Sequence, residues 1–185
     1  MKKRIIVSVI LTVCLFSTSR LLAQWHFRSV NTLQAVQGKR VVSFAVHSVN
    51  GWGRGRFFAG IGTGLDAYRQ TTVPLFFEGR ARLAGRRQQL EGWLNAGMHI
   101  PLKNDRLVFV SDGPLQTGWL QAGGLDFLVP LKRLQALVGL GYSRKEFGQL
   151  VTENIWNPAT SRLESVQRKN RYAFNRISMR VGLVF

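Results

Sequence analysis

The sequence contains little cysteine, little negative charge and, after its first residues, no long apolar run. The one cysteine among its 185 residues is Cys14, inside an apolar stretch near the amino-terminus. Once that stretch is removed, the rest of the chain can form neither disulfides nor thiolate metal sites, which excludes both classes of site. No later stretch is apolar enough for a spanning helix of roughly 20 residues, and helical periodicity is absent. These absences leave strands as the expected secondary structure.

Acidic residues are scarce: the chain has 9 Asp and Glu against 26 Lys and Arg. Residues 1–23 hold four of the basic residues, so the rest of the chain carries 22 basic and 9 acidic residues, a net charge of +13. The Arg residues are scattered through strand patterns and are not clustered with stacking aromatics, so no nucleic-acid partner is expected. For an exported chain, the expected anionic partners are outer-membrane lipids, meaning phospholipid headgroups and lipopolysaccharide.

The amino-terminus has the pattern of a secretory signal peptide. Residues 2–4 are basic and residues 5–16 are mostly apolar, a stretch too short to cross a membrane. We expect a cleaved signal peptide over residues 1–23, which leaves one domain over residues 24–185. Lipidation of the cysteine and retention as a membrane anchor are the alternatives for this segment.

Beyond this segment, apolar and polar residues alternate in stretches of roughly ten residues. Side chains on a strand alternate between its two faces, so each stretch predicts a strand that is apolar on one face only. Eight such strands are expected, over residues 25–36, 41–49, 56–68, 73–83, 89–101, 117–129, 134–144 and 176–185. Short turns are expected at Asn50-Gly51, Arg86-Arg87 and Lys132-Arg133, longer loops over residues 103–116 and 145–169, and a bulge near Gln121.

The polar faces predict a narrow, charged interior. The strand over residues 73–83 places Glu78, Arg80 and Arg82 on the face opposite its apolar residues, and such a face cannot be the core of a soluble protein. A short turn to the next strand places Arg82 opposite Glu91 and Arg80 opposite Trp93. We therefore expect a charge network in the lumen formed by Glu78, Arg80, Arg82 and Glu91, in which each charge is paired.

Glycines on one strand face agree with a narrow interior. Gly60, Gly62 and Gly64 alternate with apolar residues, which suits a tightly curved wall with little room inside. A phosphate-binding loop is not expected there, because no third glycine follows at the dinucleotide spacing and no helix pattern follows.

The last ten residues repeat the alternation to their end. The apolar positions are Ile177, Met179, Val181, Leu183 and Phe185. This segment, "NRISMRVGLVF", resembles the final strand of Gram-negative outer-membrane barrels. With "FFAGIGTGLDAY", "VPLFFEGRARL" and "GLGYSRKEF", it makes the chain similar to the small OmpA-like outer-membrane β-barrel family.

The resemblance implies an eight-stranded antiparallel transmembrane β-barrel in the cell outer membrane, with short periplasmic turns and longer outer loops. It implies that the five apolar positions are the assembly signal read by the barrel-assembly machinery. It further implies a monomer with no cofactor and usually no enzyme activity. We therefore expect a non-catalytic barrel with a structural, envelope-integrity or surface-interaction role.

Two alternative functions stay open. A small porin or transport channel would need a wet lumen, which eight strands filled by their own side chains do not leave. A lipid-A-modifying enzyme would need His99 to reach Ser111 or Asp112 in the following loop. His47 is expected at the periplasmic end, away from His99, and His26 lies close to the new amino-terminus. A metal site built from these three dispersed histidines is not expected.

Overall fold

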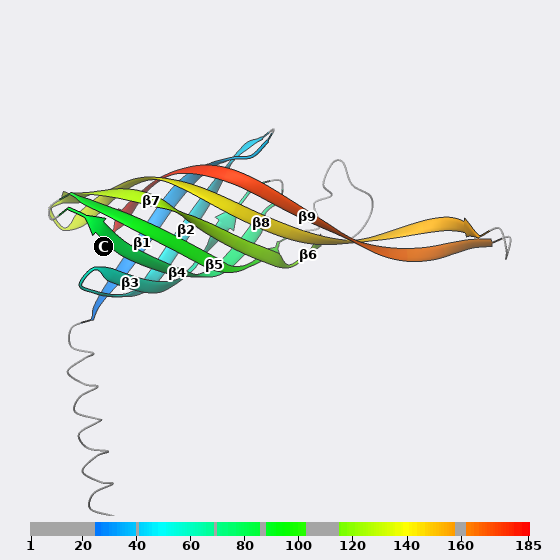
Figure 1. The fold of residues 1–185 in the computed structure, drawn as a ribbon, viewed down its shortest axis with the longest axis horizontal. Helices are drawn as coiled ribbons and strands as arrows, with labels where there is room; N and C mark the ends of the chain where they lie inside the picture. The colour runs from blue at the N-terminus through cyan, green and yellow to red at the C-terminus, as the bar shows by residue number, and fades with distance from the viewer. Residues whose placement is uncertain (1–24, 40, 69, 86–87, 103–114, 158–161) are drawn as a thin grey trace, which may run out of the picture.

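The computed structural model describes residues 25–39, 41–68, 70–85, 88–102, 115–157 and 162–185 (Figure 1). The predicted signal peptide, residues 1–23, lies outside the described residues, as does most of the predicted loop over residues 103–116. In the described part of the chain, no helix has the length and apolar character needed to cross a membrane.

The described residues form nine strands. They are β1 (His26–Gln37), β2 (Val42–Arg54), β3 (Phe57–Asp66), β4 (Thr72–Ala84), β5 (Gln89–Pro101), β6 (Leu115–Gln116), β7 (Gly118–Leu131), β8 (Leu134–Asn157) and β9 (Arg162–Val184). The two-residue β6 pairs only with β8, and the other eight strands form one closed antiparallel sheet. The prediction of eight antiparallel strands is therefore confirmed.

The sheet closes because β9 pairs with both β8 and β1. Val184 lies opposite Val30 on one side and Gln135 on the other. The main chains of Ser29 and Phe185 exchange two hydrogen bonds of 3.1 and 3.0 Å at the seam. Each of the eight strands then has two neighbours, and a closed ring leaves no long unpaired edge.

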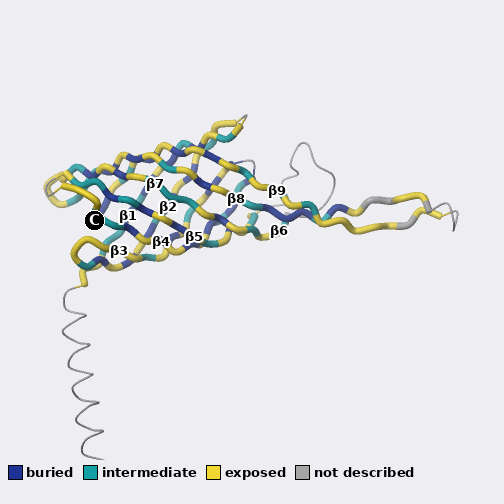
Figure 2. Tube along the Cα trace, viewed as in Figure 1, coloured by how far each residue is buried: buried dark blue, intermediate teal, exposed yellow. Residues whose placement is uncertain are grey.

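The two faces of the ring are inverted relative to a water-soluble protein. The outward face carries large apolar side chains that are exposed, such as Phe77 and Leu94 at 72% and 73%. The inward face carries charged side chains that are buried, such as Glu78 and Arg80 at 3% each. Buried and exposed residues alternate along the part of each strand that lies within the ring (Figure 2). The prediction of which residues share each face is confirmed.

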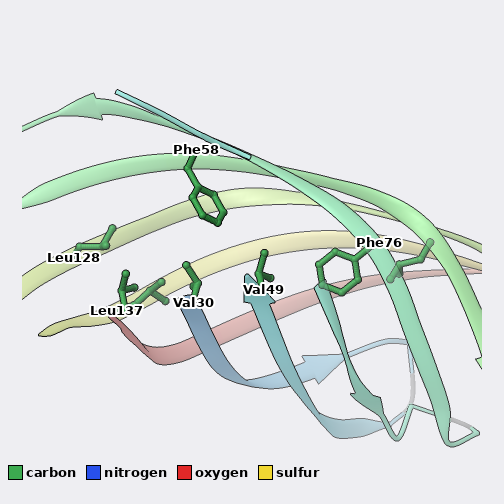
Figure 3. Close-up of a cluster of buried hydrophobic side chains, with 8 residues drawn as sticks. Val30, Val49, Phe58, Phe76, Leu128 and Leu137 are labelled. Carbon is green, nitrogen blue, oxygen red and sulfur yellow. The ribbon is translucent and has the colours of Figure 1, made fainter. Parts of the chain in front are cut away.

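Apolar side chains also fill part of the interior. One buried cluster contains Val30, Val49, Phe58, Phe76, Leu120, Leu128, Leu137 and Val184, most of which are labelled in Figure 3. Space for the large rings comes from glycines on facing strands. A Cβ atom at Gly62 would collide with the ring of Phe76, and one at Gly141 would collide with the indole of Trp93. The expected role of inward-facing glycines in a narrow interior is therefore confirmed at these positions.

The turn predicted at Asn50-Gly51 is wrong. Strand β2 continues through both residues, with Asn50 opposite Ile61, and the turn lies at residues 55–56. Gly55 adopts a φ of 62°, which suits a residue without a Cβ atom. Gly51 faces inward, where a Cβ atom would collide with the main chain of the neighbouring strand. The Asn-Gly pair therefore reflects close packing inside a strand, whereas the turn predicted at Lys132-Arg133 is present.

The loop predicted over residues 145–169 is wrong over most of its length. Strands β8 and β9 stay paired from Lys145 opposite Phe174 to Asn157 opposite Arg162. They form a hairpin that projects beyond the other strands (Figure 1). A hairpin outside the ring does not need one apolar face. Apolar and polar residues therefore do not alternate along it, and the sequence gives no strand signal there.

The bulge predicted near Gln121 is also wrong. The pairings of β7 with β5 and with β8 continue past this residue without a shift. Gln121 points outward near the first residues of β7, where one polar side chain needs no change of register. The irregularity lies on β4 instead, between Arg82 and Ala84.

We expect Gly62→Ala to destabilise the folded ring by about 1–3 kcal/mol, because the added methyl group must displace the ring of Phe76. Gly79→Ala is the matched control, since a Cβ atom at this outward position meets nothing within 4 Å. The control should be neutral or stabilising, because glycine weakens a strand. Urea unfolding in detergent micelles, followed by tryptophan fluorescence, measures both. Equal losses would contradict the packing described.

Candidate functional site: the charged interior of the ring

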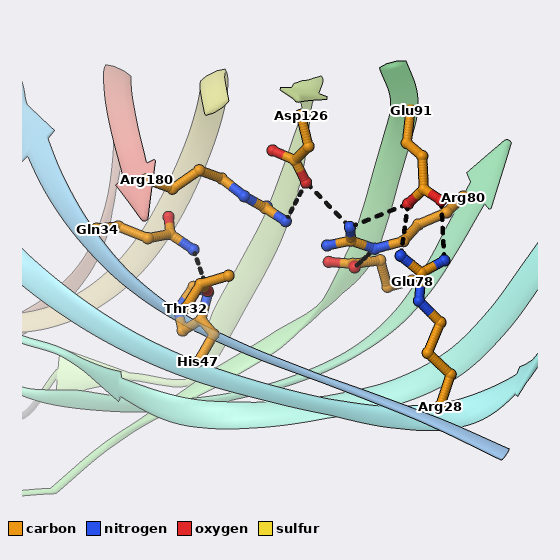
Figure 4. Close-up of polar contacts among 9 residues, drawn as sticks. All are labelled: Arg28, Thr32, Gln34, His47, Glu78, Arg80, Glu91, Asp126 and Arg180. Atoms are coloured by element: carbon orange, nitrogen blue, oxygen red, sulfur yellow. Dashed lines mark hydrogen bonds and ion pairs between the residues drawn. The ribbon is translucent and has the colours of Figure 1, made fainter. Parts of the chain in front are cut away.

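The interior holds a cluster of three carboxylates and three guanidinium groups. This cluster lies nearer the end of the ring with the short turns, and we call it the lower charge network. Its members are Arg28, Glu78, Arg80, Glu91, Asp126 and Arg180 (Figure 4). Each sits at an inward position of its strand, because the side chains of a strand alternate between faces. The register places Glu91 beside Asp126, and it places Gly139 between Asp126 and Arg180. A Cβ atom at Gly139 would collide with the Asp126 carboxylate, so this glycine gives Arg180 access to it.

Asp126 and Arg80 are at the centre of the lower charge network. Asp126 Oδ2 accepts hydrogen bonds from Arg80 Nη1 at 3.0 Å and from Arg180 Nη2 at 2.7 Å. Arg80 also donates through Nε to Glu78 at 2.6 Å, and its Nη1 lies 3.5 Å from Glu91. The guanidinium carbon of Arg180 lies 4.1 Å from the centre of the Trp93 ring, a cation–π contact.

Glu91 has a second guanidinium partner from the far side of the ring. Arg28 donates from both terminal nitrogens to the two Glu91 carboxylate oxygens, each at 2.9 Å. Two parallel bonds of this kind fix the orientation of both side chains. With Arg28 included, the positive and negative charges of the lower network balance. The balance matters because a buried charge without a partner costs several kcal/mol.

Three of the four residues predicted for the lumen network lie in this cluster, and the fourth does not. Arg82 is opposite Glu91 and Arg80 is opposite Trp93, as predicted. However, Arg82 forms no ion pair among the described residues, because Glu91 is bound by Arg28. Arg82 also adjoins the register shift on β4, near the end of the ring where the short turns lie.

Sequence reasoning missed Arg28, Asp126 and Arg180 as members of the network. Each occupies an inward position that the alternation already identified, so the polar face was visible for all three. Their partners are 63, 46 and 54 residues away in the chain. Only the closure of the ring determines which distant inward positions meet.

A second group of ionic contacts, the upper charge network, lies toward the end from which the hairpin projects. Asp66 Oδ2 accepts a hydrogen bond of 2.7 Å from Arg176 and lies 3.2 Å from the Lys145 ammonium. Lys145 also donates to the Thr72 hydroxyl at 2.7 Å, and Arg176 donates to the Ser143 hydroxyl at 3.0 Å. Aromatic rings cover this network, with Lys145 against Phe147 and Arg176 against Tyr68.

His99, the histidine considered for catalysis, contacts neighbouring residues inside the ring. His99 is fully buried, its Nε2 lies 2.6 Å from the Glu146 carbonyl oxygen, and its ring packs on Phe147. Ser111 and Asp112, its proposed catalytic partners, lie outside the described residues. Within the described ranges, no group of three or more His, Cys, Asp or Glu could hold a metal ion.

The position predicted for His47 is wrong. Strand β2 continues for seven more residues before its short turn, so His47 is not at the short-turn end. It lies inside the ring, 2.9 Å from the Gln34 side-chain amide and against the ring of Phe76. His26 is the first residue of β1, at the short-turn end.

Comparison with protein-family models gives no match, and comparison with curated proteins gives none either. The function of the chain is therefore inferred from its own sequence and geometry.

We expect Glu91→Gln to destabilise the ring by about 3–5 kcal/mol, because it leaves Arg28 buried without its carboxylate. Arg28→Gln combined with Glu91→Gln should cost less than the sum of the single changes, with a coupling of roughly 0.5–3 kcal/mol. The matched control is Arg82→Gln combined with Glu91→Gln, which should show a smaller coupling. Urea unfolding of the three single variants and the two double variants gives both values. A larger coupling to Arg82 would contradict the pairing seen here.

Proposed function

We propose that the chain is a non-catalytic integral outer-membrane β-barrel that supports the cell envelope and presents its long hairpin at the surface. The observation that carries this proposal is the continuous apolar band around the outside of the ring. Each strand of the ring contributes at least one large apolar side chain, each 48–73% exposed: Leu33, Val46, Ile61, Phe77, Leu94, Leu125, Leu140 and Val181. Water does not favour so large an apolar surface, whereas the hydrocarbon core of a membrane does.

Pairing across neighbouring strands makes the band continuous. Leu33 lies opposite Val46 on β2 and opposite Val181 on β9, so the band also crosses the seam of the ring. Ile61 lies opposite Phe77, and Leu125 lies opposite Leu140. Because the sheet is closed, the strands of the band have a hydrogen-bonded neighbour on each side. A closed sheet is one of the two structures that can satisfy its backbone in lipid.

Aromatic side chains occur at both borders of the band, as in transmembrane barrels. The exposed aromatic residues toward the short turns are Trp25, Phe27, Trp52, Phe57, Phe127 and Phe185, and those toward the hairpin include Phe44, Trp119 and Tyr142. Phe27 and Trp52 pack edge to face, with ring centres 6.0 Å apart. We assign the short-turn end to the periplasm, because short turns lie on that side in such barrels.

The filled interior supports a structural role over the small-channel alternative. Both charge networks and the apolar cluster occupy the lumen, so the described side chains leave little room for a continuous water path in the proposed barrel. The fully buried His99 gives no support to the lipid-A-modifying alternative. The proposed protein works as a monomer that meets the barrel-assembly machinery during insertion and lipopolysaccharide at its outer rim. Exposed Arg168, Lys169 and Arg171 on the hairpin suit the phosphates of lipopolysaccharide.

The direct test is the location and heat-modifiability of the protein in a Gram-negative host. We expect the chain to sediment with outer membranes, to resist extraction by alkaline carbonate and to migrate faster in gels when it is not boiled. Planar-bilayer recordings on the purified protein should show no steady conductance. Recovery of a folded protein from the soluble fraction would overturn the proposal, and a stable open channel would favour the porin alternative.

We expect Leu94→Arg and Val138→Arg each to destabilise the protein in a bilayer by roughly 2–4 kcal/mol, because Arg would enter the hydrocarbon core. Their side chains are exposed on the outward face, at 73% and 57%. Gln167→Arg is the matched control, since Gln167 is exposed on the hairpin outside the band. Unfolding in phospholipid vesicles measures all three. Equal tolerance at the three sites would indicate that the ring stands in water.

We expect deletion of Phe185 to leave unassembled chains in the periplasm. Phe185 completes the apolar series Ile177, Met179, Val181 and Leu183, and its main chain closes the seam with Ser29. Phe57→Ala is the control, because Phe57 is an exposed aromatic at the same border of the band but is not in the final strand. Immunoblots of periplasmic and outer-membrane fractions give the answer. Normal outer-membrane levels of the truncated chain would contradict the assembly-signal interpretation.

A further inference from the structure

A basic cavity of about 390 Å³ lies at the short-turn mouth of the ring. The first residues of β1, the last residues of β9 and the turn between β7 and β8 form most of its wall. The charged side chains in this wall are Arg28, Arg82, Lys132 and Arg133, with His26 beside them. Among the described residues, no Asp or Glu side chain lines the cavity.

Charge pairing leaves this cavity with an excess of positive charge. Arg28 is neutralised by Glu91, as described above. Arg82, Lys132 and Arg133 form no ion pair within the described residues. All three charges therefore remain unmatched by acidic side chains of the described residues. This excess differs from the lower charge network, where the carboxylates and guanidinium groups balance.

One donor in the cavity wall has no acceptor. The Nε atom of Arg82 is buried and has no hydrogen-bond partner. A buried donor without a partner costs free energy, so the site gains stability when an anion supplies the missing acceptor. The register explains why no internal acceptor is available, since the carboxylate opposite Arg82 is Glu91, which Arg28 and Arg80 occupy.

We propose that this mouth cavity binds a phosphate ester. A guanidinium group forms paired hydrogen bonds with phosphate oxygens, and neighbouring Lys and Arg side chains add charge that matches an anion with more than one negative oxygen. Arg82 supplies the inner donor, while Lys132 and Arg133 cover the anion from the turn. The ester is either the headgroup of a phospholipid or a free phosphate ester.

The wall of the cavity suits an ester that carries an apolar chain as well. Phe27, Leu134 and Phe185 also line it. Phe27 and Phe185 are each 60% exposed at the border of the apolar band, so acyl chains could leave the mouth directly along this surface. The cavity depends on the ring alone, and only the phospholipid source rests on the proposed membrane location.

Binding is measured on the full-length protein, expressed with its own amino-terminal segment and purified in detergent. The free probe is glycerol 1-phosphate by titration calorimetry, with glycerol as its phosphate-free control. The lipid probe is phosphatidylglycerol by native mass spectrometry, with diacylglycerol as the control. We expect one or both phosphate probes to bind and neither control to bind.

Three variants separate a built site from general charge. Arg82→Gln should weaken phosphate binding on the order of 10-fold or more, because it removes the buried charged donor. Arg133→Gln, in the exposed turn, should weaken binding roughly twofold to fivefold and keeps the test valid if the Arg82 variant does not fold. Lys39→Gln, in the exposed connection between β1 and β2 at the opposite end of the ring, removes the same charge far from the mouth and should bind like the parent protein.

Each outcome decides the proposal. Binding of glycerol 1-phosphate identifies a free ester as a sufficient ligand, and binding of phosphatidylglycerol alone identifies the headgroup. Failure of both probes, or equal loss in the Arg133 and Lys39 variants, overturns the site. A protein that inserts into membranes but binds neither probe sinks this inference and leaves the proposed function intact. Binding of a phosphate probe by a protein that never inserts into membranes supports this inference and contradicts the proposed function.

Discussion

Ion pairs that cross the full diameter of the ring are the constraint on which the structure depends. In the strand order of the closed sheet, β9 lies four places from β4, and β5 lies four places from β1, so each pair faces across the lumen. Asp126 holds Arg80 of β4 and Arg180 of β9 on one oxygen, and Glu91 of β5 holds Arg28 of β1. A closed sheet satisfies its own backbone at several diameters, whereas these side chains meet only at one. Strand number and register set the width of the ring, and the ion pairs require that width, so they stabilise it over other pairings.

This constraint explains where glycine and aromatic residues occur on the inward face. Arginine side chains that reach across the lumen need free space above the neighbouring strand, and Gly139 provides it beside Asp126. Trp93 fills the space next to Arg180 and stacks on its guanidinium group, for which it needs the missing side chain at Gly141. Polar partners and apolar filling are thus placed by the same rule: in the middle of a narrow lumen, charged side chains pair with one another and large side chains fill the space that glycines leave.

Two-residue periodicity made the strands and their faces predictable, because every strand of the ring has an exposed apolar face on one side and a lumen on the other. The same rule fails where that difference between the faces ends, and the hairpin beyond Lys145 was therefore predicted as a loop. The turn at Asn50-Gly51 was predicted wrongly because a local turn signal cannot show that Gly51 is needed inside a strand. Arg82 was paired with Glu91 because register gives only the nearest neighbour. The residue that pairs with Glu91 is Arg28, which comes near Glu91 only when β1 joins β9 and the ring closes.

The strongly basic composition follows from how the acidic residues are distributed. The chain has 9 acidic residues, and four of them, Asp66, Glu78, Glu91 and Asp126, are buried inside the ring with basic partners. Few acidic residues then remain to offset the basic side chains outside the lumen. These gather beyond both borders of the apolar band, at Arg82, Lys132 and Arg133 on one side and at Arg168, Lys169 and Arg171 on the other. A bilayer presents phosphate on both sides of its hydrocarbon core, so the charge that the lumen leaves unmatched would meet an anionic layer at each end of the proposed barrel.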